Sequence, residues 1–132
     1  MRRAVLLALA VLLTGCETGP SRMALEPPSE PVFNVFFRPG SAALTPNTEK
    51  TVDSAAISIA QDHPRSVVIS AGATPGDDLQ YAEARFQVVQ TTLVAKGVNP
   101  AVIVRATLPE SPIKLDATAD RRVEIKLLDI RP

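Results

Sequence analysis

The sequence predicts an α+β fold in which two helices cover one face of a mixed four-stranded sheet. Three observations favour this fold class. Runs of β-forming residues alternate with amphipathic helical stripes, their order along the chain is β-α-β-α-β-β, and a length of 132 residues suits a single domain. We therefore expect a two-layer sandwich with both apolar stripes buried against the sheet.

The first half of the domain has a strand pattern followed by a helix pattern. The segment 32–37 is rich in β-forming residues and stops at a Pro39-Gly40 turn. Thr45 is placed to cap a helix whose first residue is Pro46. This helix is expected to end near His63, because the residue before a proline avoids the α region. Its predicted apolar stripe consists of Val52, Ala55, Ala56, Ile59 and Ala60.

The second half holds the other helix and three further strands. Strands are predicted over 66–70, 101–107 and 121–129, and the last of these alternates apolar and charged residues. The helix is expected to begin at Asp77, with Gln80 completing a capping box, and to end before Gly97. Its predicted stripe consists of Leu79, Ala82, Phe86, Val89 and Leu93.

The N-terminus is typical of an exported protein. Residues 1–15 combine a basic start with an unbroken apolar run over 4–13, which is too short to span a bilayer and is typical of a signal peptide. The sequence Leu13-Thr14-Gly15-Cys16 resembles the bacterial lipobox, in which the cysteine is acylated after cleavage before it. An ordinary signal peptide with a chance cysteine is the alternative. We expect Cys16 to be lipidated and to anchor the chain to a membrane.

A tether follows the expected cleavage site. Residues 16–31 contain four prolines and few large apolar side chains, so we predict a disordered linker behind the lipidated cysteine. By resemblance to enterobacterial sorting, an aspartate after the cysteine would retain a lipoprotein in the inner membrane. Glu17 stands there instead, which favours the outer membrane. The folded domain is then expected over residues 32–129.

Composition and charge exclude several classes of function. Lys+Arg and Asp+Glu both number 14, so no excess of cations is available to neutralise nucleic-acid phosphates. One cysteine and one histidine cannot form an intramolecular disulfide or a Cys/His zinc site. The histidine, His63, is expected at a helix end without a nucleophile arranged beside it. We predict a protein that is not an enzyme and requires no metal or cofactor.

Several motifs in order along the domain carry a family resemblance. They are Gly40-Ser41-Ala42-Ala43-Leu44-Thr45-Pro46, Gly72-Ala73-Thr74, Tyr81-Ala82-Glu83-Ala84-Arg85-Phe86 and Asp120-Arg121-Arg122-Val123-Glu124-Ile125. With them the domain resembles the OmpA-like C-terminal domain, the peptidoglycan-binding module of outer-membrane protein A and of the peptidoglycan-associated lipoprotein. The resemblance implies the same α+β sandwich and a binding role.

The resemblance also implies a site for the diaminopimelate of the peptidoglycan stem peptide. Such a zwitterion needs an anion for its ammonium group and a cation for its carboxylate. In the family an aspartate after a G-x-T motif binds the ammonium group, and the arginine of an LSxxRA motif binds the carboxylate. Here Arg85 stands at the arginine position and Thr74 ends the G-x-T motif, but Pro75 replaces the aspartate and the loop is shorter.

The altered loop leaves two interpretations open. Either Asp77 or Asp78 supplies the missing carboxylate, or both only cap the second helix and the pocket is lost. Arg85 in turn either contacts the ligand or lies over the edge of the core and pairs with Glu83 or a loop carboxylate.

Two further arginines lie on the last predicted strand. Arg121 and Arg122 are adjacent, so one is expected to face the helices or the pocket rim and the other the open sheet face. The resemblance makes one of them a neighbour of the pocket. The candidate ligand-binding residues are therefore Arg85, Asp77, Asp78, Thr74, Arg121 and Arg122.

The predicted function follows from the anchor, the tether and the resemblance. We expect an outer-membrane lipoprotein whose domain faces the periplasm and binds peptidoglycan non-covalently. The alternative is a degenerate OmpA-like domain that no longer holds stem peptide and serves as a docking or assembly module for envelope proteins.

Overall fold

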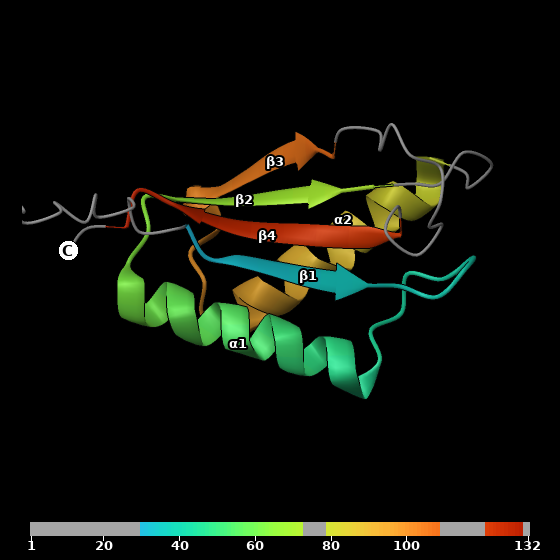
Figure 1. Ribbon diagram of the computed structural model, residues 1–132, viewed down its shortest axis with the longest axis horizontal. Coiled ribbons are helices and arrows are strands. Elements are labelled where there is room, and N and C mark those ends of the chain that lie inside the picture. The colour runs from blue at the N-terminus through green and yellow to red at the C-terminus, as the bar shows by residue number, and fades with distance from the viewer. Residues whose placement is uncertain (1–29, 73–78, 109–120, 131–132) are drawn as a thin grey trace, which may run out of the picture.

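The computed structural model describes residues 30–72, 79–108 and 121–130. Along the chain it has a strand, a helix, a strand, a helix, a 3₁₀ turn and two strands (Figure 1). In order these are β1 (Val32–Phe36), α1 (Pro46–Asp62), β2 (Ser66–Ala71), α2 (Leu79–Ala95), η1 (Pro100–Val102), β3 (Ile103–Thr107) and β4 (Arg122–Leu128). The predicted element order is confirmed, while residues 1–29, most of the predicted tether included, lie outside the described ranges.

The four strands form one mixed sheet in the order β1-β4-β2-β3. Strand β4 runs antiparallel to both of its neighbours, and β2 runs parallel to β3. The last strand therefore occupies an interior position. Its alternation fits that place, because Val123, Ile125 and Leu127 are each 0 % exposed on the face that the helices cover.

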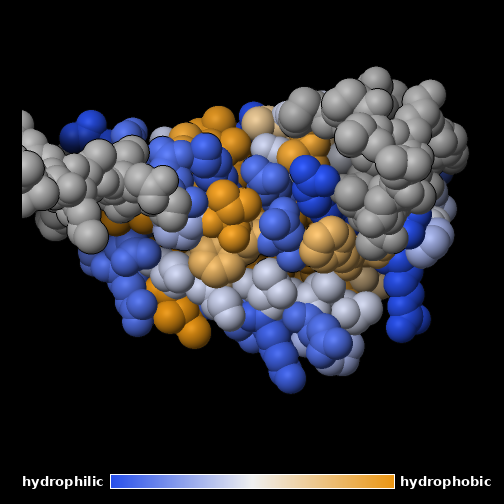
Figure 2. All heavy atoms as spheres, in the orientation of Figure 1, coloured by the Kyte–Doolittle hydropathy of each residue, from blue (hydrophilic) through white to orange (hydrophobic). Residues whose placement is uncertain are grey.

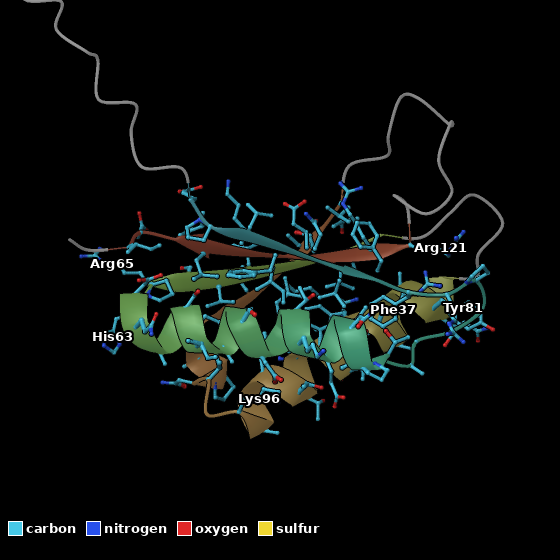
Figure 3. All side chains as sticks on the ribbon, turned by 60° about the horizontal axis from the view of Figure 1, so that its bottom comes forward. Phe37, His63, Arg65, Tyr81, Lys96 and Arg121 are labelled. Atoms are coloured by element: carbon cyan, nitrogen blue, oxygen red, sulfur yellow. The ribbon has the colours of Figure 1, made fainter. Side chains whose placement is uncertain are left out.

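Both helices pack on the same face of this sheet, as the sequence predicts (Figures 1 and 3). Together with the inward side chains of the strands they form a single core. The helices contribute Val52, Ala55, Ala56, Ile59, Phe86, Val89 and Leu93 to it. The other sheet face is open, and Figure 2 shows hydrophobic and hydrophilic side chains mixed across it.

Helix α1 begins and ends where local chemistry dictates. Thr45 caps it in a reciprocal capping box with Thr48, and Pro46 occupies the first turn. His63 ends it in the left-handed conformation (φ 47°), just before Pro64. Ala60, predicted to belong to the buried stripe, is exposed, because it lies on the flank of the helix, one position beyond the last core contact at Ile59.

The segment after α2 corrects one strand boundary. Gly97 follows the helix at φ 98°, a left-handed conformation that suits glycine. Asn99 then caps the 3₁₀ turn η1 by accepting a hydrogen bond from the Ala101 N–H at 2.9 Å. The predicted strand over 101–107 therefore starts only at Ile103.

Neither described helix is long and apolar enough to cross a lipid bilayer.

Candidate functional site

Arg85 is the most unusual side chain of the core. It projects from α2 and is 0 % exposed, the largest of the fully buried side chains among the described residues. Its Nε donates a hydrogen bond to the carbonyl oxygen of Ser41 at 3.0 Å, and a terminal nitrogen donates to that of Arg38 at 3.5 Å. The guanidinium carbon also lies 5.7 Å from the ring centre of Phe37 and 5.6 Å from that of Tyr81. Within the described residues, oriented carbonyl dipoles and two π faces thus contact the cation.

The turn between β1 and α1 provides the carbonyl groups. Gly40 adopts φ 59°, a conformation that side-chain-bearing residues rarely adopt, and the Ser41 N–H donates to the Arg38 carbonyl at 3.2 Å. This tight turn carries both acceptors for Arg85. The phenol oxygen of Tyr81 lies beside Gly40, 3.8 Å from the position that a Cβ atom would take there. Arg85 therefore ties α2 to the β1–α1 turn.

The two adjacent arginines at the start of β4 point in different directions. The half-buried Arg121 donates from Nε to the carbonyl oxygen of Phe37 at 3.4 Å, so it joins the end of the molecule where Arg85 lies. Figure 3 shows Phe37, Tyr81 and Arg121 together at this end. Arg122 lies on the open sheet face and pairs with Glu124 at 3.8 Å. Of the two, Arg121 is the neighbour of Arg85.

The remaining predicted ligand residues fall outside the described ranges. These are Thr74, Asp77 and Asp78, and the same holds for Cys16. The described residues on either side of the 73–78 segment lie near the arginines. The Gly72 N–H donates to the carbonyl oxygen of Arg122 at 3.1 Å, and α2 begins at Leu79, less than two turns before Arg85.

Glu83 does not pair with Arg85, which corrects that choice of partner; the loop carboxylates offered as the other choice lie outside the described residues. Its carboxylate pairs instead with Arg105 of β3 and accepts a hydrogen bond from Gln87 at 2.9 Å. The hydrogen bond from Arg105 lowers the pKa of Glu83 to about 2. Arg105 also lies over the ring of Phe86, 4.5 Å from its centre. The i,i+4 spacing of Glu83 and Gln87 was visible in the sequence, but the contact with Arg105 was not.

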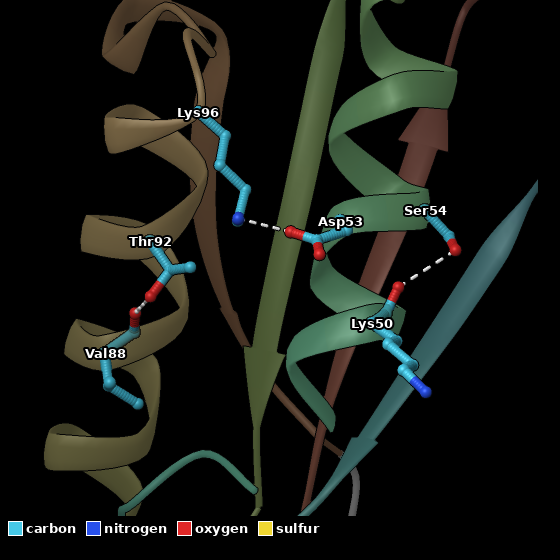
Figure 4. A network of polar contacts seen from close by, with 6 residues as sticks. All are labelled: Lys50, Asp53, Ser54, Val88, Thr92 and Lys96. Atoms are coloured by element: carbon cyan, nitrogen blue, oxygen red, sulfur yellow. Dashed lines mark hydrogen bonds and ion pairs between the residues drawn. The ribbon is translucent and has the colours of Figure 1, made fainter. Parts of the chain in front are cut away.

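The opposite end of the molecule has a groove of about 390 Å³ between the C-terminal ends of the two helices. His63 lies there, exposed at the end of α1. Close by, Lys96 pairs with Asp53 and links α2 to α1 (Figure 4). The groove is lined by Ala56, Ile59, Ala60, His63, Pro64, Lys96, Gly97, Val98, Asn99 and Val102. Among the described residues no cluster of His, Cys, Asp and Glu side chains could hold a metal ion.

No protein-family model and no curated protein matches the sequence. The structure is similar to the OmpA-like domain of FopA1 from Francisella tularensis, with a TM-score of 0.64 and 18% identity over 73% of this chain and 70% of that one. The chain has the OmpA-like fold.

Two further solved structures with the OmpA-like fold resemble the chain to a similar degree. The C-terminal domain of Helicobacter pylori MotB gives a TM-score of 0.59 at 17% identity, over 70% of this chain and 81% of that one. The peptidoglycan-associated lipoprotein from Burkholderia pseudomallei gives 0.58 at 17% identity, over 73% and 88%. In this chain the OmpA-like fold places Arg121 with Phe37 and Tyr81 at one end of the sheet and His63 at the other (Figure 3).

Proposed function

We propose that this protein is a lipoprotein of the bacterial outer membrane whose OmpA-like domain binds the stem peptide of peptidoglycan without catalysis. The single observation that carries the proposal is the arginine end of the domain. A carboxylate-binding site needs a cation held by the fold, and Arg85 and Arg121 converge there on Phe37 and the adjoining turn. The likeness to a structure named a peptidoglycan-associated lipoprotein supports the same assignment.

In the proposed site, the carboxylate and the ammonium group of the ligand are bound by different residues. Arg85 and Arg121 supply positive charge for a carboxylate. Asp77 and Asp78, which precede α2, supply negative charge for the ammonium group of the same amino acid. Thr74 completes the proposed set, whereas Arg122, which pairs with Glu124 on the open sheet face, is not part of it. Since a zwitterion requires both signs at a fixed separation, loss of either sign is expected to abolish selective binding.

Burial of Arg85 sets a condition on this mechanism. A guanidinium that is 0 % exposed meets a ligand only after a covering group moves. Among the described residues, Tyr81 and the turn from Arg38 to Ser41 contact Arg85 and are candidates for this movement. We infer that binding is coupled to a local rearrangement, so association should be slow compared with an open charged site.

Co-sedimentation with purified sacculi tests the binding. The full chain should pellet with sacculi, and free diaminopimelate should compete it off. Arg85→Lys keeps a cation on a long stem but lacks the Nε donor to Ser41, so it should weaken pelleting at least tenfold. Lys96→Ala, which removes a cation at the opposite end of the domain, is the matched control and should pellet like the unaltered protein.

The outcome distinguishes specific binding at this site from non-specific adsorption to sacculi. Pelleting that both variants reduce equally, or that diaminopimelate leaves unchanged, contradicts a stem-peptide site. Recovery of the unaltered protein wholly in the supernatant contradicts peptidoglycan binding itself. Circular dichroism of Arg85→Lys should match that of the unaltered protein, which keeps loss of binding distinct from loss of fold.

The anchor is a separate part of the proposal and has its own test. Growth with a labelled fatty acid should label the unaltered protein and leave a Cys16→Ser variant unlabelled. Membrane fractionation should then place the labelled protein with the outer membrane and release part of the variant. Labelling that persists in Cys16→Ser contradicts acylation at this residue.

A docking module is the second candidate, and the burial of Arg85 favours it. If the hydrogen bonds from Arg85 to Ser41 and Arg38 serve only to fix the turn, the domain keeps its fold without a stem-peptide pocket. In-cell crosslinking of the full chain decides between the two. Adducts with envelope proteins alone support docking, whereas adducts with peptidoglycan fragments support the binding function.

A further inference from the structure

The outer edge of β3 is an unusual sheet edge. Of the four described strands, β1 and β3 lie at the edges of the sheet. A free edge presents backbone donors and acceptors that readily pair with another strand. The middle residue of β3 is Arg105, which pairs with Glu83, and its neighbour Val104 is 46 % exposed on the open sheet face. This edge combines an exposed apolar side chain with a pair of opposite charges.

The hydrogen-bonding pattern fixes which groups of β3 point outward. The Leu108 N–H donates to the carbonyl oxygen of Ala71, so the even-numbered residues of this strand face β2. Ile103, Arg105 and Thr107 consequently direct their backbone groups away from β2. The Ile103 N–H is already bonded to the Pro100 carbonyl in the η1 turn. The outward groups are therefore three carbonyl oxygens and the N–H groups of Arg105 and Thr107.

These groups are self-complementary about Arg105. In an antiparallel pairing of two β3 strands centred on this residue, the two Arg105 residues exchange two hydrogen bonds. Each Thr107 N–H then donates to the Ile103 carbonyl oxygen of the other copy, which adds two more. Val104 of each copy lies opposite Ala106 of the other, at the closer, non-hydrogen-bonded positions, so the exposed valine becomes covered.

The charges are also complementary. Glu83 and Arg105 have side chains that are 45 % and 53 % exposed, so both are within reach of a second molecule. Across the twofold axis each guanidinium approaches the carboxylate of the other copy as well as its own. Four charges of alternating sign then form a ring, which offsets the repulsion between the two arginines. The groove of about 420 Å³ beside this edge, lined in part by Gln80 and Thr107, leaves room for these side chains.

The helix layer permits this pairing at β3 and opposes it at β1. Helix α1 packs on β1, so two copies joined edge to edge at β1 would bring two α1 helices together. Strands in a sheet are about 4.8 Å apart, whereas packed helices need about 8–10 Å between axes. Helix α2 packs mainly on β2 and β4, and it meets β3 through the side chain of Arg105, which contacts Glu83 and Phe86. Of the two sheet edges in the described part of the chain, the β3 edge is therefore the one that accepts a second copy without a collision between the described helices.

We propose that two copies of this chain associate through antiparallel pairing of their β3 strands about Arg105, which yields a dimer with one continuous eight-stranded sheet. The interface is isologous, so each copy contributes the same residues and the assembly closes at two subunits. Its formation depends on the β3 edge and not on peptidoglycan. The dimer and the stem-peptide site can therefore fail independently.

Disulfide crosslinking locates the interface. In a Cys16→Ser background of the full chain, Arg105→Cys places two cysteines across the twofold axis at a spacing that a disulfide tolerates. Mild oxidation should convert most of the protein to a covalent dimer. Asn34→Cys, at the middle of the other edge strand, is the matched control and should stay monomeric. Equal crosslinking of the two variants, or none at residue 105, overturns the proposal.

Charge reversal tests the ring of charges. Rescue of dimerisation in a mixture of two variants is a result that damage to the fold alone would not give. Glu83→Arg and Arg105→Glu should each be monomeric in sedimentation velocity, because all four charges at the axis then have the same sign and repel one another. An equimolar mixture of the two should form a heterodimer, since each arginine then meets a carboxylate of the other chain. A mixture that stays monomeric while the unaltered chain is dimeric overturns the charge complementarity. A monomeric unaltered chain at about 100 μM overturns the dimer itself.

Discussion

Arg85 and Arg105 both bind α2 to another part of the fold, yet their surroundings differ completely. Arg85 is fully buried, and among the described residues its contacts include two backbone carbonyl oxygens and two aromatic rings. Arg105 is half-exposed and is held by the carboxylate of Glu83. Because no water can replace a lost contact of the buried Arg85, loss of such a contact should lower the free energy of unfolding strongly. At Arg105 water and salt screen the ion pair, so its loss should lower that free energy less. The first arginine is expected to govern stability and the second to govern association.

Truncation of Arg85 should have the largest effect. Arg85→Ala removes a large buried side chain and charge-assisted hydrogen bonds, so the free energy of unfolding should fall by about 3 kcal/mol. Urea denaturation measures this change. Arg85→Met keeps much of the volume without the charge and should recover part of the loss. A change below about 0.5 kcal/mol in Arg85→Ala would remove the distinction between the two arginines.

The cap beside the Arg85 turn should have the next largest effect. Thr45→Ala removes the side-chain acceptor for the Thr48 N–H and should cost about 1 kcal/mol. Thr51→Ala is the matched control. Its hydroxyl bonds only the Asn47 carbonyl within the helix, so this change should be neutral or slightly stabilising. Equal losses for the two variants in thermal unfolding would contradict a specific capping role.

Loss of the exposed pair should matter least to the fold. Arg105→Gln should lower the melting temperature by less than Thr45→Ala does, because the pair is solvated on both sides. Lys126→Gln, which breaks another exposed pair with Glu30, serves as the comparison. A melting-temperature loss at Arg105 as large as that of Arg85→Ala would show that exposure does not separate the two arginines.

The pH dependence of the Glu83 contribution sharpens the same comparison. Because Arg105 lowers the pKa of Glu83 from its usual 4.5 to about 2, the carboxylate stabilises the fold above pH 4.5 and loses this effect as the pH falls toward 2. The difference in melting temperature between the unaltered protein and Glu83→Gln should therefore be constant from pH 5 to 8 and shrink below 4.5. A melting-temperature difference between the two proteins that grows as the pH falls below 4.5 would contradict a lowered pKa of Glu83.

The sequence by itself determined the elements and the faces they bury. Thr45, Pro46 and Pro64 mark the limits of α1 through capping chemistry and the steric demands of proline, and these act over a few residues. The alternation of Val123, Ile125 and Leu127 likewise identified the buried face of β4. The η1 turn was missed because Ala101 and Val102 were assigned to the predicted strand over 101–107, whereas the Asn99 cap holds them in a 3₁₀ turn.

Only the tertiary structure decided the strand order, the burial of Arg85 and the partner of Glu83. Arg85 meets the carbonyl of Ser41 across 44 residues of sequence, and Arg105 meets Glu83 across 22. Local periodicity carries no information on such distant contacts, so the sequence offered Glu83 as a partner for Arg85 on proximity alone. The arrangement of the sheet explains the partners of Glu83 and Arg85. It brings β3 beside α2, leaves Glu83 at the surface with Arg105, and encloses Arg85 beneath the β1–α1 turn.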